Sequence, residues 1–328
     1  MSDEWVGVLV NDSMFQGIPK RRTGYESLGN YEQGGRRYGV KPCFFRLRDI
    51  RQGDSQVLAY VLHDGRYVRR RLPLPRVIHN RGLWFRGNAK QQISRLSEQG
   101  HAVFNQWNRY SKLRIHELLM LEPSLRPHLP HTVRGNADNL RMMMECHSSL
   151  IVKPDSGSVG RGVMKLDRTD QGWILDWAPY RSRRKRTKTR FAPQAHLPKP
   201  LARTLQAGTH LIQQRLPLAS FSERPFDMRV SVQKGAAGDW QVTGVNVKVA
   251  SRSVFLTNVA QGAAVYNLPA VLTAFPNLQP ERILCEVESF SLAVARHLDR
   301  HLPHLADLGL DIGLTEFGFP MFIERNNS

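Results

Sequence analysis

Cysteine is scarce in this sequence of 328 residues and occurs only as Cys43, Cys146 and Cys285. The three residues lie far apart and form no CxxC pair, which argues against a disulfide framework and against a structural zinc site. We therefore expect three free thiols, buried in the core of a protein that works in a reducing cytoplasm.

Long hydrophobic runs are missing as well. No stretch approaches the roughly 18 consecutive apolar residues that a transmembrane helix needs. The opening residues Met1–Glu4 end on two acids, whereas a secretory signal begins with basic residues and continues with apolar ones. The sequence predicts no membrane span, and its 41% hydrophobic and 23% charged residues are ordinary for a globular chain.

Familiar catalytic signatures are also absent. The chain contains neither a GK[ST] Walker A motif nor a GxGxxG fingerprint, and it shows no recognisable Ser-His-Asp or Cys-His arrangement. It therefore does not match P-loop or Rossmann nucleotide sites. An enzyme whose chemistry needs no side-chain nucleophile is still possible.

Acidic residues are outnumbered, because 47 Lys and Arg face 28 Asp and Glu, which gives a formal net charge of +19. Such a surface attracts polyanions: nucleotide phosphates, nucleic acid or an acidic substrate. Seven of the cations lie in Arg181–Arg190, which contains no acid. Three interpretations of this run stay open: a contact for nucleic acid or another polyanion, a solvated hairpin, and an entrance patch for an acidic peptide or polymer.

The first part of the chain is typical of an α/β domain. The apolar run Trp5–Val10 predicts a buried strand, and further strands are expected at Val57–Val61 and Val77–Asn80, with a turn at Gly65. We place these elements in a first domain over residues 1–105.

The second domain is expected over residues 106–328. Apolar residues at helical spacing predict a helix over Trp107–Leu121 at its start and a long amphipathic helix over Ile283–Leu298. Between them, Ser149–Lys153 and Val163–Leu166 read as two strands joined by a glycine-rich loop. Backbone amides of such a loop can approach phosphates, although many glycine hairpins are only tight turns.

Two later segments alternate polar and apolar residues, as strands do. Asp227 and Arg229 share one face of the first segment, and Asn246 and Lys248 share one face of the second. A single pair of this kind is typical of a surface ion pair that contributes little to stability. Together with the glycine loop, they indicate a charged face on one sheet.

The C-terminal segment predicts a β-hairpin. We expect Thr315–Gly318 to form a four-residue turn, which pairs Leu314 with Phe319 and Asp311 with Phe322.

This register places Asp311, Glu324 and Asn326 on one face, while Met321 lies with Ile312 on the other. Two carboxylates and an amide oxygen suit a hard cation such as Mg²⁺ that also holds nucleotide phosphates. A solvated polar face is the alternative interpretation.

Taken together and in this order, these motifs resemble the YheC/YheD (endospore coat-associated) family of the ATP-grasp superfamily. The resemblance covers nearly the whole chain. Its segments are Val6–Asp12, Leu72–Arg81, Ser111–Leu119, Ile151–Pro154 with its glycine loop, Leu211–Gln214, Phe226–Arg229, Val254–Gly262, and Leu308–Gly313 followed by Ile323–Asn326.

The resemblance implies an α+β and α/β protein: a small preATP-grasp domain precedes an ATP-grasp fold in which two α+β subdomains clamp ATP. The nucleotide-binding subdomain is expected at about 106–215 and the catalytic subdomain at about 216–328.

The resemblance also implies roles for individual residues. The ATP-binding set is Lys112, Lys153, Ser156, Gly157, Ser158, Gly160, Gly162, Gln213, Gln214 and Asp227; the catalytic set is Arg229, Lys248 and Asn258; the Mg²⁺ ligands are Asp311, Glu324 and Asn326. Lys248 stands where the family commonly has arginine, and a lysine cannot make the same bidentate contact.

The implied activity is an ATP- and Mg²⁺-dependent ligase that joins a carboxylate to an amine or a thiol through an acyl phosphate and releases ADP and phosphate. An amino acid or an acidic peptide is the implied substrate class, in a cytoplasmic and spore-associated setting. The alternative is a catalytically degenerate ATP-grasp protein with a structural role, which binds nucleotide or nucleic acid.

Overall fold

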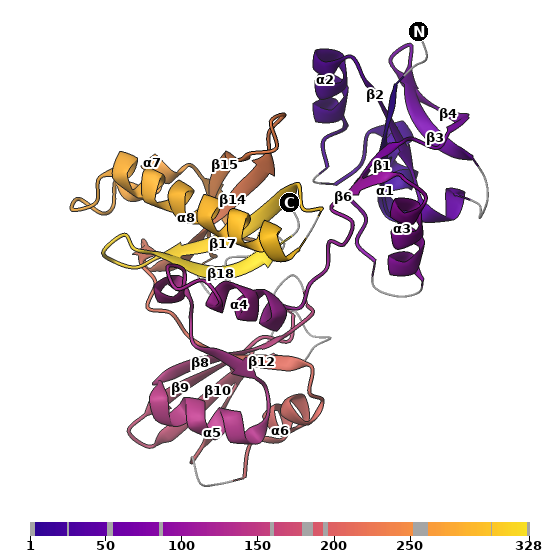
Figure 1. Ribbon diagram of the computed structural model, residues 1–328. Coiled ribbons are helices and arrows are strands. Elements are labelled where there is room, and N and C mark those ends of the chain that lie inside the picture. The colour runs from indigo at the N-terminus through magenta and orange to yellow at the C-terminus, as the bar shows by residue number, and fades with distance from the viewer. Residues whose placement is uncertain are drawn as a thin grey trace. The chain divides into compact units, whose positions relative to one another are not determined.

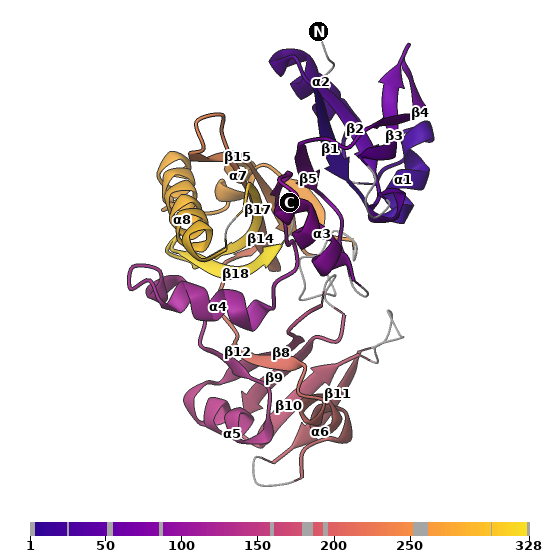
Figure 2. The ribbon, with the colours of Figure 1, turned by 45° about the vertical axis from the view of Figure 1, so that its right-hand side comes forward.

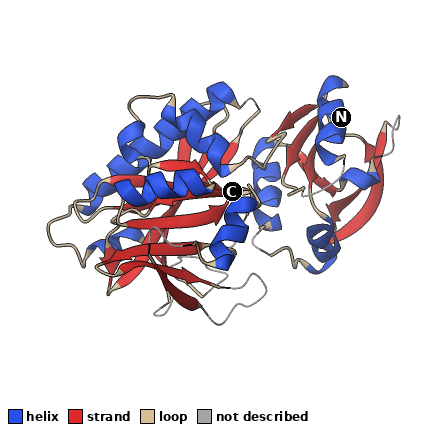
Figure 3. Ribbon diagram, turned by 90° about the horizontal axis from the view of Figure 1, so that it is seen from below, coloured by secondary structure: helices blue, strands red, loops and turns tan. Residues whose placement is uncertain are grey.

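The chain divides into two compact units. The first comprises Met1–Arg109 with Leu302–Ala306, and the second comprises Tyr110–His301 with Asp307–Ser328. Both units mix helices and strands (Figure 3). The computed structural model describes residues 4–24, 26–50, 55–84, 88–157, 161–178, 186–192, 196–251, 262–302 and 304–326. Within these ranges, every helix is too short or too polar to cross a lipid bilayer.

The first unit is built on one mixed sheet (Figure 1). Its elements are β1 (Trp5–Leu9), α1 (Asp12–Gly17), η1 (Ile18–Lys20), α2 (Leu28–Tyr38), β2 (Lys41–Phe45), η2 (Leu47–Asp49), β3 (Gln56–His63), β4 (Arg66–Pro73), β5 (Val77–Asn80), α3 (Ala89–Glu98) and β6 (Ala102–Phe104). The strand order is β4-β3-β2-β1-β5-β6. β1 pairs in parallel with β2 and β5, whereas β3 and β4 form an antiparallel hairpin.

The strands expected in this unit are confirmed, and so is the turn at Gly65, whose φ of 75° suits glycine. Apolar side chains pack against both faces of the sheet. One cluster contains Phe45, Ile78 and Ile93, and the other contains Phe15 together with residues of the opposite face. Both faces are therefore covered, as in other sheets with a parallel centre.

The second unit contains two sheets and the helices that cover them. Its elements are α4 (Lys112–Met120), η3 (Arg126–His128), β7 (Thr132–Arg134), α5 (Ala137–Cys146), β8 (Ser149–Pro154), β9 (Met164–Thr169), β10 (Gly172–Trp177), β11 (Thr187–Phe191), α6 (Lys199–Gln206), β12 (His210–Gln214), β13 (Ser220–Phe221), β14 (Arg224–Lys234), β15 (Trp240–Val249), β16 (Ala264–Tyr266), α7 (Leu268–Leu272), α8 (Pro280–His301), β17 (Asp307–Leu314) and β18 (Pro320–Asn326).

The first sheet of this unit has the order β11-β10-β9-β8-β12-β7. Helices α5 and α6 lie against one of its faces, where Leu150, Val152 and Ile212 are fully buried (Figure 1). The two strands of the expected glycine-rich hairpin are confirmed, because residues 149–152 of β8 pair in antiparallel fashion with residues 164–167 of β9. Side chains alternate along β8, so the residues between the buried ones point to the opposite face.

The second sheet has the order β16-β15-β14-β17-β18, with β13 paired to β14. Helix α8 lies along one of its faces (Figure 2). The predicted apolar stripe of this helix is confirmed, since Ile283, Val287, Phe290, Val294 and Leu298 are all buried. The other face of the sheet is therefore available for polar residues.

The helix predicted over Trp107–Leu121 is shorter than expected, because α4 begins at Lys112. Ser111 caps it by accepting a hydrogen bond from a backbone N–H of the first turn. The carboxylate of Asp155 accepts from another N–H of that turn, at 2.9 Å. Before the helix, the buried side chain of Asn108 donates a hydrogen bond to the backbone carbonyl of Asn80 at 2.8 Å. This bond holds the residues before Lys112 in a non-helical conformation.

The predicted register of the C-terminal hairpin is wrong by one residue at the turn. Leu314 pairs with Pro320 rather than with Phe319, so five residues separate the two strands. As a result, Met321 pairs with Gly313 on the face that also carries Asp311, not on the face of Ile312.

A bulge between Asp311 and Ile312 then restores the expected face of the acids. Asp311 lies directly opposite Glu324, and Phe322 rather than Met321 pairs with Ile312. The two carboxylates share one face, as predicted, although Asp311 does not pair with Phe322.

The expected burial of the cysteines is confirmed only for Cys43. Cys146 and Cys285 are exposed. Each lies on a helix whose apolar stripe is formed by other residues, so neither thiol is needed in the core.

Candidate functional site

Charged side chains from four neighbouring strands meet on the free face of the second sheet. Strand pairing places Asp227 opposite Lys248, and Arg229 opposite Asp311. Glu324 follows opposite Asp311 on the next strand. Residues paired directly across strands point to the same face, so these five form one cluster, which we call the ionic cluster.

Asp311 holds the centre of the ionic cluster. Its carboxylate accepts from Arg229 Nε at 2.8 Å and from Lys248 Nζ at 2.9 Å, and the side chain is almost fully buried. Burial by itself would raise the pKa of this carboxyl. The two cations outweigh burial and hold the pKa below its ordinary value, so Asp311 is ionised.

The cations respond in the opposite sense. Lys248 Nζ also lies 2.7 Å from Asp227 Oδ1, so one ammonium bridges two buried carboxylates. Burial disfavours its charged form, but Asp311 and Asp227 raise the pKa of Lys248 above its usual value. The pKa of Arg229 is raised for the same reason, so both residues carry full positive charge.

Lys153 faces the ionic cluster from the first sheet. It is 8% exposed, and its Nζ donates to the carbonyl of Ile323 on β18 at 3.4 Å. Burial is the main reason that the pKa of Lys153 is lowered to about 8; Glu324 and Asp311 oppose this shift, whereas Lys112 adds to it. A buried ammonium that titrates near neutral pH is well suited to bind an anion that replaces lost solvation.

Lys112 connects the glycine-rich loop to the second sheet. Its Nζ donates to the carbonyl of Gly157 at 2.6 Å and lies 3.3 Å from Glu324 Oε1. Gly162, at the far end of the loop, has φ of 72°, which favours glycine. Ser156 precedes Gly157 in this loop.

Gln213 and Gln214 lie at the end of β12, between β8 and β7. Gln213 pairs with a residue of each neighbouring strand, and its side chain donates to Thr132 Oγ1 at 2.9 Å. The backbone N–H of Gln214 donates to His131 at 2.8 Å. Gln213 therefore shares the face that carries Lys153, whereas Gln214 is paired with Leu150 of the opposite face, and much of the backbone of both residues is already paired.

Several expected residues lie outside what the structure describes. These are Ser158, Gly160 and Asn258, the side chain of Asn326, and the basic residues from Arg181 to Lys185. Of the same basic run, Arg186 is described and pairs with Asp176 at 2.6 Å. It precedes β11, an edge strand of the first sheet.

His116 is a member of this site that the sequence analysis missed. It is 8% exposed, and burial together with the nearby charge of Lys153 lowers its pKa to about 4, so the ring is neutral at pH 7. Its position four residues after Lys112 places both on one face of α4, which is the signal that the sequence offered.

The donor set fits a hard cation. Among the described residues no group of three His, Cys, Asp or Glu is placed to hold a metal ion. Asp311 and Glu324, however, lie side by side on paired positions. Mg²⁺ is commonly held by one or two carboxylates together with substrate phosphates, and the lysines supply countercharge for such phosphates.

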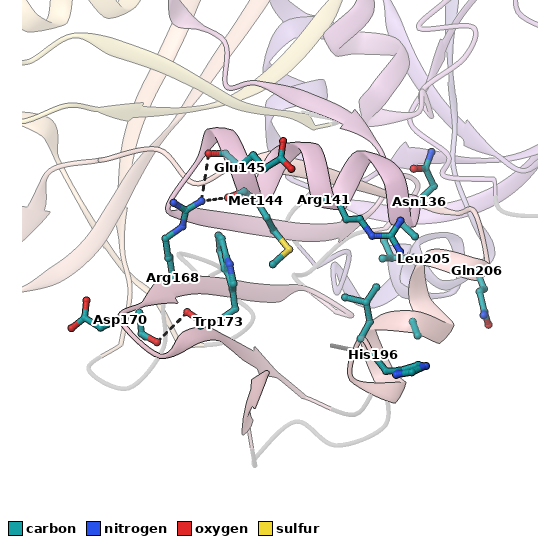
Figure 4. A pocket seen from close by; sticks show the side chains of 15 residues that line it. Asn136, Arg141, Met144, Glu145, Arg168, Asp170, Trp173, His196, Leu205 and Gln206 are labelled. Atoms are coloured by element: carbon teal, nitrogen blue, oxygen red, sulfur yellow. Dashed lines mark hydrogen bonds between the residues drawn. The ribbon is translucent and has the colours of Figure 1, made fainter. Parts of the chain in front are cut away.

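A separate pocket of about 1410 Å³ lies on the α5 and α6 side of the first sheet (Figure 4). Arg168 packs over the ring of Trp173 and donates to the carbonyl of Met144 at its wall. None of the predicted site residues lines it. Its charged lining mixes arginines with acids, so it shows no preference for an anion or a cation.

A comparison with protein families identifies the fold. A model of the family described as YheC/D like ATP-grasp matches residues 100–328. The chain belongs to this family. The predicted family and the predicted ATP-grasp fold are thereby confirmed, and the two sheets of the second unit are its two halves.

Relatives in Bacillus subtilis (strain 168) carry the family's name. The chain is 22% identical to endospore coat-associated protein YheD over 298 residues, which cover 87% of this chain and 64% of YheD. It is 23% identical to endospore coat-associated protein YheC over 303 residues, covering 88% of this chain and 81% of YheC. The match therefore spans less than two thirds of YheD.

Solved ATP-grasp structures share the fold. One is the ATP-grasp ligase PsnB complexed with minimal precursor, with a TM-score of 0.53 and 16% identity over all of this chain and 91% of that chain. At this identity the likeness concerns the fold. In this ATP-grasp chain, Lys112, Lys153 and the ionic cluster lie where the two halves of the fold meet.

Proposed function

We propose that this ATP-grasp protein is an ATP- and Mg²⁺-dependent ligase that joins a carboxylate to an amine, with a thiol as the other possible nucleophile. The carboxylate oxygen attacks the γ-phosphorus of ATP and ADP leaves. The amine then attacks the acyl carbon, phosphate leaves, and the amine loses a proton. An amino acid or an acidic peptide is the proposed carboxylate substrate.

One observation carries the proposal. Two lysines of the first half of the fold, Lys112 and Lys153, face two adjacent carboxylates of the second half, Asp311 and Glu324. The two carboxylates can hold the metal of a metal–triphosphate, and the two lysines can bind its phosphates. A site for nucleic acid would need no such paired carboxylates.

The remaining residues have separate proposed roles. Asp311 and Glu324, with Asn326, would hold Mg²⁺, which when bound neutralises phosphate charge. Lys112 and Lys153 bind the phosphates, together with the glycine loop, which also excludes water. Gln213 and Gln214 lie beside the adenine, and Asp227 keeps Lys248 in place.

On the second sheet, Arg229 and Lys248 are proposed to stabilise the transferred phosphoryl group, with Asn258 as a further donor. In the structure both cations are bound to Asp311. If Asp311 held a cation, Arg229 and Lys248 would be available to bind an anionic substrate.

The test is release of ADP and phosphate with Mg²⁺ present, while pools of amino acids, acidic peptides and short RNA are added one at a time. We expect one carboxylate-containing pool to stimulate release. Lys153→Met should lower that rate by about a hundredfold or more. Lys199→Met, the same change at an exposed residue of α6, is the control and should leave it unchanged.

Two outcomes would contradict the proposal. Stimulated ADP release that persists in Lys153→Met would place the reaction elsewhere. Tight ATP binding without ADP formation in any pool would favour a nucleotide-binding structural role. Spore association is part of the proposal, and it rests on the names of the two Bacillus relatives.

A further inference from the structure

Positive charge is concentrated in the first unit, which contains none of the residues of the ionic cluster. Residues 1–109 contain 19 Lys and Arg and nine Asp and Glu, a net charge of +10 out of +19 for the chain. Four of these cations belong to the single strand β4, as Arg66, Arg69, Arg70 and Arg71. All four are exposed.

β4 is the last strand of its sheet. Along its eight residues it pairs with β3, and within the part of the chain that the structure describes no other strand lies on its outer side. An edge strand presents a row of backbone N–H and C=O groups without strand partners. Pro73 at its end is also typical of an edge, since proline cannot donate to a ladder.

The four arginines are divided between the two faces of this edge strand. Because side chains alternate along a strand, Arg69 and Arg71 lie on one face, and Arg66 and Arg70 lie on the other. Among the described residues, no ion pair joins any of the four to a carboxylate. No carboxylate of the described residues therefore neutralises these four charges, although Arg69 lies over two aromatic rings.

Charged residues on an edge strand also prevent edge-to-edge aggregation, and lysine is the residue most often used for that. Three consecutive exposed arginines go further, because the guanidinium fork matches carboxylate geometry in a way that an ammonium does not. A backbone edge combined with such donors recognises both the main chain and the side chains of an acidic strand.

We propose that β4 is a docking edge for an extended, acidic segment of a partner polypeptide, which adds to the sheet as a seventh strand. Successive side chains of the added strand would point to opposite faces. Its acidic side chains would then lie beside Arg69 and Arg71 on one face and beside Arg70 on the other. A partner segment of eight residues would span about 26 Å. This surface acts independently of ligation.

Single-stranded nucleic acid fits the edge less well. Bases need exposed aromatic rings on which to stack. The rings beside β4, Phe15 and Tyr60, are buried or half-buried, and the guanidinium of Arg69 already lies over both, at 5.3 and 5.2 Å from their centroids. The edge therefore offers backbone pairing, which only a polypeptide can use.

The experiment uses the full chain and a fluorescein-labelled peptide of Glu-Glu-Thr-Thr repeats, which as a strand carries Glu on both faces. The peptide is about as long as β4, and its binding is read by fluorescence anisotropy. We expect binding that weakens as salt is raised. Arg70→Glu with Arg71→Glu should weaken it by about tenfold or more. Arg36→Glu with Arg37→Glu, the same charge change on exposed residues of α2, should change it less than about threefold.

A second peptide separates strand addition from charge attraction alone. N-methylation at every residue keeps every carboxylate but removes the N–H groups on both edges of the peptide, so that it cannot donate to β4 in either orientation. We expect this peptide to lose about tenfold in affinity, and hydrogen exchange to show new protection within residues 66–73 when the unmodified peptide binds.

Three results would overturn the proposal. If the methylated peptide bound as tightly as the unmodified one, charge attraction alone would explain the binding. If the β4 and α2 variants weakened peptide binding by the same factor, β4 would not be the binding site. Tighter binding of a single-stranded RNA that depends on Arg70 and Arg71 would assign the edge to nucleic acid. If the β4 variant fails to fold, the methylated peptide and the exchange measurement still decide.

Discussion

Replacing Asp311 with asparagine tests the ionic cluster through its central carboxylate. The substitution keeps the shape of the side chain and removes its charge. Arg229 then loses its carboxylate partner at 2.8 Å, and Lys248 loses one of two. Asp311 is 8% exposed, so water cannot solvate the two cations in place of the lost carboxylate charge.

The magnitude follows from this burial. Breaking a buried ion pair by neutralising one partner costs about 3–5 kcal/mol of unfolding free energy. Because Lys248 keeps Asp227 at 2.7 Å, we expect the lower end, about 3 kcal/mol. For a domain of this size that corresponds to a fall in Tm of about 6–12 °C.

The assay is thermal unfolding followed by circular dichroism at pH 7, with ligand-free protein. Arg282→Gln, which breaks an exposed i,i+4 pair with Glu286 on α8, is the control and should change stability by less than about 0.5 kcal/mol. A fall in Tm for Asp311→Asn no larger than that of the control would refute the reasoning.

The same variant predicts a pH dependence. The native pKa of Asp311 lies below its ordinary value, so the stability that it contributes is present above about pH 4. That contribution is lost as the pH falls through the lower, native pKa. The difference in Tm between the native protein and Asp311→Asn should therefore narrow at acid pH.

Two further predictions concern Lys153 and the thiols. Because burial lowers the pKa of Lys153 to about 8, the ammonium is mostly neutral above that pH in the free protein, and a bound triphosphate should restore its charge. Calorimetry in buffers of different ionisation enthalpy should therefore show proton uptake on ATP binding near pH 9 and much less near pH 7; equal uptake at both would be inconsistent with the low pKa. For the thiols, Ellman's reagent should modify Cys146 and Cys285 in the native protein but Cys43 only after unfolding, because burial raises the pKa of Cys43 to about 12; rapid reaction of all three would contradict its burial.

Much of the site was predictable because strand alternation is a local rule. Asp227 and Arg229 share a face in any strand, and the structure confirms this without help from distant residues. The glycine-rich hairpin and the buried stripe of α8 are confirmed for the same reason, since both follow from residues within one or two turns of the chain.

Positions that depend on distant partners were predicted less well. The start of α4 is decided in part by Asp155, whose carboxylate accepts from Leu113, 42 residues earlier in the chain. The register at Leu314 depends on the length of the turn, and the pairing of Asp311 depends on a bulge, which adds a residue to one strand and leaves no clear mark in the alternation. Exposure of Cys146 and Cys285 depends on which helix face finds a partner in the fold.

The sequence by itself determined the family, the ATP-grasp fold, the charged strand faces and the shared face of Asp311 and Glu324 in the C-terminal hairpin. Only the tertiary structure decided that Lys153 reaches Ile323, 170 residues away, that Lys248 bridges Asp227 and Asp311, and that His116 is buried beside them. The physical reason is that side-chain direction follows from local backbone geometry, whereas burial and charge pairing depend on which surfaces pack together.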